Sequence, residues 1–387
     1  MKILFVSCAY PPLYTGIGAY TANMAEALSL AGHEVVVATS RIEGKSEQEE
    51  TASGLILRCY SHEELRTTQL ARRLLRLAVE HHADLVECAD FLGEGGPLLR
   101  LQRNIPVCVK AHNSGPVRVG RDAEVLYPWQ KFMQWAAILR GLRQYREERY
   151  SLEHGDLLVT PSQRLMDELV EQGFSLPAKR AVQPNPISLP EHCPEKCEAE
   201  QPTVLFVGRL AIGKGIAVLP TLLKRLVAWF PDVRMVIAGD DSYARGLGSL
   251  RKWLMRRFGD LAVHVEFTGQ LNREQLARQY REAWVILVPS CWDTFPTVLL
   301  EAMAWATPVA ASPHGGMVEM LDNTLCLAVD PDSEGYAEEV KRLIDDRSLR
   351  LAAGRSLFAK ARACYAPEVV GGQYGRILSS LLATTSS

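Results

Sequence analysis

The sequence predicts an α/β protein with two doubly wound parallel sheets, one in each half of the chain. Short apolar runs typical of buried strands alternate with amphipathic stretches typical of helices. This alternation stops at a charged segment rich in proline, near 183–202, and then begins again. The chain has 387 residues, which is long enough for two separate cores. We expect a first domain over 1–185, a linker over 186–202, a second domain over 203–365 and a terminal segment over 366–387, with the two domains facing each other across a cleft.

The composition excludes several classes of protein. Apolar residues make up 47% of the chain and charged residues 23%, as in a globular protein in water. The 43 basic and 45 acidic residues leave a net charge of -2, so nucleic-acid binding is not expected. No apolar run reaches the roughly 18 residues that a membrane-spanning helix needs. Nine cysteines lack the spacing of a disulfide framework, which favours a reducing, cytoplasmic compartment.

Two short segments have alternative interpretations that the residues disfavour. The apolar N-terminus MKILFVSCAYPP has no cleavage pattern of small residues, so we interpret it as a strand rather than a signal peptide. His192, Cys193 and Cys197 form one cluster, but HCPEKC matches no standard zinc spacing. We therefore expect no metal site.

A glycine-containing loop follows the first strand. The strand (2–7) leads through YPPLYTGIGAYT to a helix (21–31) and a second strand (33–39). The loop is not a dinucleotide fingerprint, because it has only G-x-G and no acidic residue ends the second strand. Two interpretations of Gly16 and Gly18 stay open. They either form a turn with positive φ or let a ligand approach the backbone closely.

Polar residues follow later strands of the first domain. A charged helix is expected over 62–82 and a strand over 83–90, after which Glu94 is either an exposed loop acid or a side chain pointing into the cleft. A strand over 105–109 delivers Lys110 and His112 to its carboxyl end. A polar cluster in such a loop indicates function more than a single core histidine does.

A long helical stretch, 127–150, is rich in aromatic and basic residues. Such a stripe is typical of a helix with one core face and one solvated face. The alternative is docking on a membrane surface. A strand over 155–162 and a helix over 163–172 complete the first domain.

The second half begins with two cations beside a glycine turn. Its first strand, 203–210, contains Arg209 near its end, and Lys214 follows just before a helix over 216–229. Cations and free backbone N–H groups are what a diphosphate needs. The segment is not a Walker loop, because G-x-x-x-x-G-K-[ST] is absent.

The other expected elements of the second half carry fewer polar residues. A strand over 234–241 ends in two aspartates, to which we assign no metal. A strand, a turn and a helix follow over 265–276. Near the end we expect a strand over 325–331, a helix over 333–344 and a terminal helix over 367–382.

The most informative stretch is VILVPSCWDTFPTVLLEAMAWATPVAASPHGGMVEM, residues 285–320. It predicts a buried strand, a loop, a helix over 296–305 and a second strand. Asp293 lies just before the helix and Glu301 within it, with Thr294 expected to cap the helix and Pro296 to take its first position. Helix N-termini that follow parallel strands present free N–H groups at the ligand edge of the sheet, so this loop suits a diphosphate.

This stretch resembles the signature of two acids separated by seven residues in the retaining nucleotide-sugar glycosyltransferases of family GT4. GRLAIGKG (208–215) is similar to the family's GR(L)xxxKG signature, and the loop at Gly16 is similar to its N-terminal Gly-Gly loop, with Thr15 in place of the first glycine. The resemblance covers nearly the full length and is strongest over 203–320. It implies the GT-B fold, in which two Rossmann-like domains face each other and the C-terminal helix crosses back to the first.

The resemblance also implies an enzyme that moves a sugar from a nucleoside-diphosphate sugar to an acceptor hydroxyl, with the anomeric configuration retained. Arg209 and Lys214 would hold the diphosphate, and Asp293 would bind sugar hydroxyls. Glu301 would bind the ribose, while His112 would orient the sugar. The other donor-binding residues implied are Gly16, Gly18, Leu271 against the base, Phe295, and the backbone N–H groups of Thr297 and Val298.

The implied partners are the donor and an acceptor bound by the first domain. The acceptor is a saccharide, a lipid-linked molecule or a small molecule, in polysaccharide, glycolipid or other glycoconjugate biosynthesis. No cofactor, essential metal or nucleic acid is expected. The expected location is the cytoplasm, with peripheral contact at the cytoplasmic face of the membrane for a lipid-linked acceptor.

The chain departs from the family pattern at the first acid. The family has Glu followed by Gly-Phe-Gly, where this chain has Asp293-Thr294-Phe295-Pro296. Aspartate is one methylene shorter, and proline donates no N–H. Two alternatives therefore stay open: a non-catalytic nucleotide-sugar-binding or scaffold protein of the same fold, and a nucleotide-sugar 2-epimerase.

Overall fold

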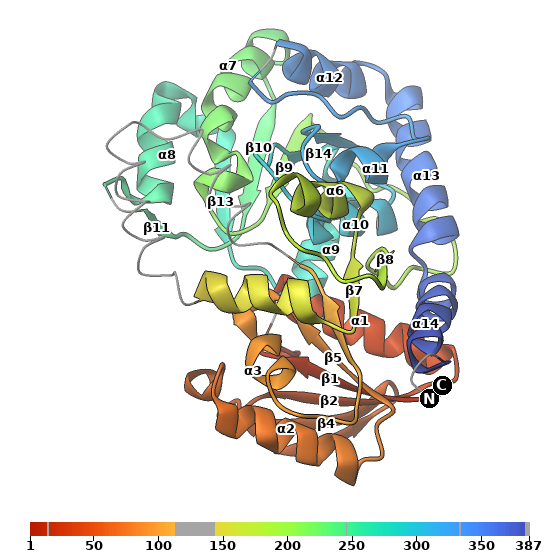
Figure 1. Ribbon diagram of the computed structural model, residues 1–387. Helices are drawn as coiled ribbons and strands as arrows, with labels where there is room; N and C mark the ends of the chain where they lie inside the picture. The colour runs from red at the N-terminus through yellow and green to blue at the C-terminus, as the bar shows by residue number, and fades with distance from the viewer. Residues whose placement is uncertain (14, 113–143, 245, 333, 384–387) are drawn as a thin grey trace. The chain divides into compact units, whose positions relative to one another are not determined.

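The computed structural model describes residues 1–13, 15–112, 144–244, 246–332 and 334–383 (Figure 1). The chain divides into two compact units. The first unit holds the described residues of 1–117, 137–188 and 364–387, and the second holds those of 189–363. The end of the chain therefore returns to the first unit, which confirms the expected crossing of the C-terminal helix.

The described strands of the first unit form an eight-stranded sheet in the order β3-β4-β2-β1-β5-β6-β7-β8. Neighbouring strands are parallel, except for the antiparallel pair β3 and β4. The strands are β1 (Lys2–Ser7), β2 (Glu34–Ser40), β3 (Gln48–Thr51), β4 (Gly54–Tyr60), β5 (Leu85–Ala89), β6 (Val107–Lys110), β7 (Leu157–Thr160) and β8 (Arg180–Val182). The pair β3 and β4 was not predicted, because β3 is polar and fully exposed and so lacks an apolar signal.

Helices connect these strands. They are α1 (Gly16–Leu30), η1 (His62–Glu64), α2 (Thr68–Glu80), η2 (Phe91–Gly93), α3 (Gly95–Leu99), residues 144–154, α6 (Gln163–Glu171) and α14 (Pro367–Ala383). The single helix expected over 62–82 is wrong. Arg66 has a φ of +67°, which separates η1 from α2, and the Thr67 hydroxyl accepts from Leu70 N–H to begin α2 anew.

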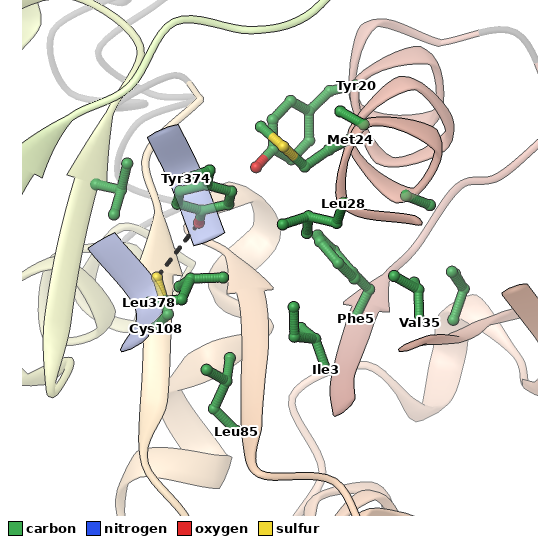
Figure 2. Close-up of a cluster of buried hydrophobic side chains, with 14 of the residues drawn as sticks. Ile3, Phe5, Tyr20, Met24, Leu28, Val35, Leu85, Cys108, Tyr374 and Leu378 are labelled. Atoms are coloured by element: carbon green, nitrogen blue, oxygen red, sulfur yellow. Dashed lines mark hydrogen bonds between the residues drawn. The ribbon is translucent and has the colours of Figure 1, made fainter. Parts of the chain in front are cut away.

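One apolar cluster ties the two ends of the chain together. Side chains of β1, α1 and β5 meet Tyr374 and Leu378 of α14 in this cluster (Figure 2). The backbones of α1 and α14 approach so closely that a Cβ atom on Gly371 would lie 1.9 Å from Ala27 O. Glycine is therefore required at this crossing. The return of the chain thus involves this close backbone contact together with apolar burial.

The second unit contains a parallel sheet of five described strands in the order β13-β10-β9-β14-β15. The strands are β9 (Thr203–Val207), β10 (Arg234–Ala238), β13 (Val265–Gly269), β14 (Val285–Val288) and β15 (Val309–Ala311), with a separate hairpin of β11 (Tyr243–Ala244) and β12 (Gly248–Ser249). The strand expected over 325–331 is wrong, since this segment forms a single bridge between Ala328 and Ala311. The predicted class of two parallel α/β sheets is confirmed.

Helices of the second unit follow its strands in sequence. They are η3 (Ile212–Lys214), η4 (Ile216–Val218), α7 (Leu219–Trp229), α8 (Leu250–Phe258), η5 (Gly259–His264), α9 (Arg273–Glu282), α10 (Thr297–Ala304), α11 (Met317–Leu321), α12 (Glu334–Asp345) and α13 (Arg347–Cys364). Of the helices that the structure describes, none combines the length and apolar character needed to cross a membrane.

Candidate functional site

Three loops meet at the carboxyl edge of the second sheet. The loop after β14 is bonded to the loop after β9 through Cys291 N–H and Gly213 O at 2.9 Å. The loop after β15 is bonded to it through Gly316 N–H and Asp293 O at 2.9 Å, and through the Ser312 hydroxyl and Ser290 O at 2.5 Å. The loop that carries Asp293 is therefore held from both sides, and Glu301 follows in α10.

Two glycines make this meeting of loops possible. Gly215 has a φ of +75°, and a Cβ there would lie 1.8 Å from Pro289 O. Gly315 has a φ of +69°, and a Cβ there would lie 1.9 Å from Asp293 O. Both positions demand glycine for the backbone angle and for the close approach. The glycines of the GKG and HGG patterns thus allow the loops after β9 and β15 to contact the loop after β14.

Lys214 and Asp293 form an ion pair across this junction. Lys214 Nζ lies 2.5 Å from Asp293 Oδ2, and the side chains are 43% and 15% exposed. The resemblance had assigned the two residues to different parts of a ligand. A pair with one partner this exposed to solvent contributes about 1 kcal/mol or less to stability. The pair can therefore be exchanged for ligand contacts at small cost.

Arg209 lies two residues after β9 and is exposed. Its main chain is held, because the neighbouring Leu210 N–H donates to Asp240 O at 2.9 Å. Within the described part of the chain, its guanidinium group makes no hydrogen bond or ion pair. Arg209 thus presents an unused cation at the edge where Lys214 lies.

Helix α10 begins one residue later than predicted. Pro296, rather than Thr294, is the N-cap, and no side chain caps the helix. Pro296 O accepts from Leu299 and Leu300, while the N–H groups of Thr297 and Val298 have no acceptor among the described residues. Two free N–H groups at a helix start favour an anion. Pro296 itself has no N–H group to donate, so the N–H groups of Thr297 and Val298 are the two donors that remain.

Two aromatic side chains lie in the loop that leads into α10. Phe295 is 5% exposed and Trp292 is 8% exposed, so both side chains of the loop that carries Asp293 are buried. The Nε1–H group of Trp292 is buried without an acceptor among the described residues. Phe295, which the resemblance implied as a donor contact, is thus almost fully covered in the structure.

Glu301 is held by a partner that the sequence did not reveal. Tyr280 Oη donates to Glu301 Oε2 at 2.7 Å, and Tyr280 is 1% exposed. Burial raises the pKa of Glu301, although the Tyr280 hydrogen bond and Arg273 act in the opposite direction. No local pattern marks Tyr280, because it lies in α9 and reaches Glu301 through the fold alone.

Leu271 and the two aspartates after β10 lie at the same sheet edge. Leu271 is half-buried and follows β13, where Gly269 O accepts from Gly239 N–H at 2.9 Å. Asp241 accepts from Arg251 N–H and from the Ser249 hydroxyl, so it caps the start of α8. Among the described residues, no group of three or more His, Cys, Asp or Glu side chains is placed to hold a metal ion.

In the first unit, Gly16 and Gly18 begin α1. Neither has a positive φ, so the interpretation as a positive-φ turn is wrong. Gly18 N–H donates to Thr15 Oγ1 at 3.0 Å, and a Cβ on Gly18 would lie 2.8 Å from Leu13 O. A Cβ on Gly16 would meet nothing within 4 Å. Gly18 is thus needed for the bend into the helix, and Gly16 keeps the backbone uncovered.

His112 lies just past β6, as predicted. Its main-chain N–H donates to Asp90 Oδ1 at 2.8 Å, and its ring lies 4.4 Å from the Tyr20 ring in an edge-on arrangement. Burial, and secondly the charge of Lys110, lower the pKa of His112 to about 3. The imidazole is therefore neutral at physiological pH. The helical stretch 127–143, with its membrane interpretation, lies outside the described residues.

Glu94 is not an exposed loop acid. It is 6% exposed, and neither carboxyl oxygen has a donor at hydrogen-bonding geometry in the described residues. Burial raises its pKa to about 8, against a smaller lowering by the Cys8 thiol and amide. Glu94 is therefore largely protonated at neutral pH.

This raised pKa makes stability depend on pH. The folded protein holds the Glu94 proton up to about pH 8, while the unfolded chain releases it near the ordinary glutamate pKa of 4.5. The contribution of the raised Glu94 pKa to the free energy of unfolding is therefore full below about pH 4.5 and is lost as the pH rises through 8. Relative to Glu94→Gln, which cannot titrate, we expect the wild-type free energy of unfolding to fall by up to about 1.4 kcal/mol per pH unit in this window.

Urea unfolding at several pH values between 5 and 8 measures this difference. Glu63→Gln, which changes an exposed glutamate of the same unit, is the matched control. A difference between wild type and Glu94→Gln that stays constant with pH would contradict the prediction.

Comparison with known proteins identifies the family. The model described as Glycosyltransferase Family 4 matches residues 14–190, and the model described as Glycosyl transferases group 1 matches residues 193–356. The chain belongs to the GT4-type glycosyltransferases. A GT4-type relative, a glycosyltransferase of Methanocaldococcus jannaschii, is 26% identical over 90% of both chains.

Solved structures confirm that this glycosyltransferase has the GT-B fold. Sucrose-phosphate synthase from Thermosynechococcus elongatus matches with a TM-score of 0.79 and 22% identity over 99% of both chains. Anabaena Alr3699/HepE, solved in complex with UDP and glucose, matches with a TM-score of 0.68 and 16% identity over 98% of this chain and 100% of the other.

Proposed function

We propose that this glycosyltransferase moves a sugar from a nucleoside-diphosphate sugar to an acceptor hydroxyl, with retention at the anomeric carbon and without a metal ion. The observation that carries the proposal is the positive edge of the second unit. Arg209, Lys214 and the free N–H groups of Thr297 and Val298 occupy the carboxyl ends of two neighbouring strands, β9 and β14. A departing diphosphate develops negative charge, which such preorganised groups stabilise.

Donor binding would exchange the resting ion pair for ligand contacts. Lys214 would turn from Asp293 to the diphosphate, and Asp293 would become free to accept from sugar hydroxyls. Aspartate suits this exchange because Lys214 already reaches it at 2.5 Å. The shorter acid is thus compatible with the role that the resemblance implied for glutamate. The Asp293 side chain anchors the sugar and does not attack it.

The remaining predicted residues have distinct proposed roles. Glu301, steadied by Tyr280, accepts from the ribose hydroxyls with the oxygen that Tyr280 leaves unused. Leu271 and its turn lie against the base. His112 of the first unit, neutral and therefore able both to donate and to accept, orients the sugar. Gly16 leaves room for donor or acceptor beside the start of α1.

The sugar, the base and the acceptor are the finer parts of the proposal. Because the Anabaena relative was solved with UDP and glucose, UDP-glucose is the first donor to test. We propose a saccharide, lipid-linked or small-molecule acceptor in glycoconjugate biosynthesis, and a reaction in the cytoplasm.

A thermal-shift panel tests the donor site. UDP, GDP and ADP, each with and without a sugar, are added to wild type, to Lys214→Ala and to Lys252→Ala, which removes an exposed lysine of the same unit. We expect one nucleotide, at about 100 times its Kd, to stabilise wild type and Lys252→Ala by about 2.7 kcal/mol. Lys214→Ala is expected to lose most of this shift.

The outcomes separate the proposed function from its alternatives. A shift with none of the nucleotides in the folded protein would contradict the donor site. A shift without acceptor-dependent release of nucleoside diphosphate would instead favour a nucleotide-sugar-binding protein without catalysis. The anomeric coupling constant of the product, read by NMR, tests retention.

A further inference from the structure

A carboxylate lies inside an otherwise apolar strand of the first unit. Glu87 is in β5 and is 1% exposed. Tyr20 Oη donates to its Oε1 at 2.6 Å, and Tyr374 Oη donates to its Oε2 at 2.6 Å. A buried carboxylate costs several kcal/mol unless it is satisfied in this way, and an apolar replacement would often be as stable. Net stability therefore does not explain why an acid occupies this position.

The two tyrosines come from opposite ends of the chain. Tyr20 belongs to α1 and Tyr374 to α14, and Figure 2 shows both rings within one cluster. The Tyr374 oxygen also lies 3.5 Å from Cys108 Sγ of β6. Since the phenol proton goes to Glu87, the Cys108 thiol donates in this contact. The hydroxyl of Tyr374 therefore has a fixed direction.

Tyr20 connects this network to His112. The Tyr20 ring meets the His112 ring at 4.4 Å between centroids, with an interplanar angle of 70°. A phenol whose hydroxyl is bonded to Glu87 cannot swing away from this contact. Asp90 fixes the main chain of His112 at the same time. The Tyr20 side chain thus links Glu87 to the His112 ring.

Lys110 lies near the same two rings. Its Nζ donates to Gln183 O at 2.5 Å and lies 5.3 Å from the Tyr20 ring centroid and 5.8 Å from that of Tyr374. Both rings therefore lie within reach of a cation–π contact. Gln183 is in turn linked to Gln373 of α14 through Nε2 and Oε1 at 3.4 Å. Two polar paths therefore lead from α14 to β6, the strand that precedes His112.

We propose that Glu87 and Tyr374 are positioning residues for His112, so that the C-terminal helix α14 sets the orientation of this imidazole through Glu87 and Tyr20. The inference rests on the proposed role of His112 in orienting the transferred sugar. A contact that only anchors α14 would affect stability alone, whereas a positioning contact also affects the reaction.

The test uses Tyr374→Phe in the full chain, because this change removes one hydroxyl and keeps the packing. Tyr336→Phe is the matched control, since Tyr336 in the second unit is buried as well and donates to Ala310 O at 2.9 Å. We expect Tyr374→Phe to lower kcat about tenfold or more while the Kd for the nucleoside diphosphate is unchanged. Tyr336→Phe is expected to lower thermal stability with kcat unchanged.

A double-mutant cycle shows whether the effect passes through His112. In the His112→Ala background, Tyr374→Phe is expected to cause no further loss of kcat. The ring nitrogen and carbon shifts of His112, read by NMR without substrate, are expected to move in Tyr374→Phe and to stay in place in Tyr336→Phe.

Two results would overturn the proposal: equal stability losses in both variants with kcat unchanged, or full additivity with His112→Ala. If wild type shows no turnover at all, the proposed function has failed instead. In that case the NMR shifts of the His112 ring still test whether Tyr374 positions it, and unchanged shifts in Tyr374→Phe reject the positioning role.

Discussion

Lys214→Ala is expected to lower kcat/KM for the nucleotide sugar by about 10²- to 10³-fold, which corresponds to about 3 to 4 kcal/mol of transition-state stabilisation. The reason is that Lys214 lies with Arg209 and the start of α10 where a diphosphate would develop charge. The same change is expected to leave the urea midpoint nearly unaltered, because the 43% exposed Lys214 contributes little through its pair with Asp293. Steady-state kinetics and urea unfolding measure the two effects separately.

A second variant makes this prediction sharper. Asp293→Ala removes the other half of the pair, and the double variant closes a cycle. If the two residues act on one bound donor, their effects on kcat/KM are expected to be less than additive. Lys252→Ala is the control for loss of a surface cation and should retain full activity. A loss of stability that matches the loss of activity in Lys214→Ala would show that the residue is structural.

Gly315→Ala is expected to damage both stability and activity more than Gly269→Ala does. Both glycines have a φ of +69°, so the cost of this angle, about 1 to 2 kcal/mol, is common to the two variants. At Gly315 the new Cβ would lie 1.9 Å from Asp293 O, whereas at Gly269 it would meet nothing within 4 Å. We expect an additional loss of about 1 to 3 kcal/mol at Gly315, as in other overpacked sites.

The activity of Gly315→Ala is the more informative readout. Relief of the clash must displace the Asp293 main chain, which also accepts from Gly316 N–H. We expect kcat/KM to fall at least tenfold, since misplacement of about 1 Å in a binding group has effects of this size or larger. Equal urea midpoints and equal kcat/KM values for the two alanine variants would contradict the close-approach argument.

Local patterns predicted much of the fold and of the second unit's site. Apolar runs located β9, β10, β13 and β14, and the polar residues that follow these strands are all at one sheet edge in the structure. These predictions succeeded because the carboxyl ends of parallel strands share an edge whatever the details of packing. The polar, exposed strand β3 left no such pattern and was missed.

Other features depend on contacts between distant residues. Lys214 and Asp293 are 79 positions apart, and their pairing requires that Gly215 and Gly315 let the loops touch. Pro296, and not the predicted Thr294, is the N-cap of α10. The start of this helix is fixed by the loop after β14, which its neighbours hold, rather than by the best local capping residue. The sequence could not indicate the burial of Glu94 either, because a loop acid looks the same whether or not other elements cover it.

The sequence by itself determined the alternation of strands and helices, the two-part α/β class and the motifs that mark the family, because each of these depends on neighbouring residues and on rules for parallel sheets. Tertiary structure alone decided which side chains meet. It pairs Lys214 with Asp293, places Tyr280 on Glu301, and joins Tyr20, Glu87 and Tyr374 beside His112. Those meetings depend on the packing of segments far apart in the chain, which no local pattern encodes.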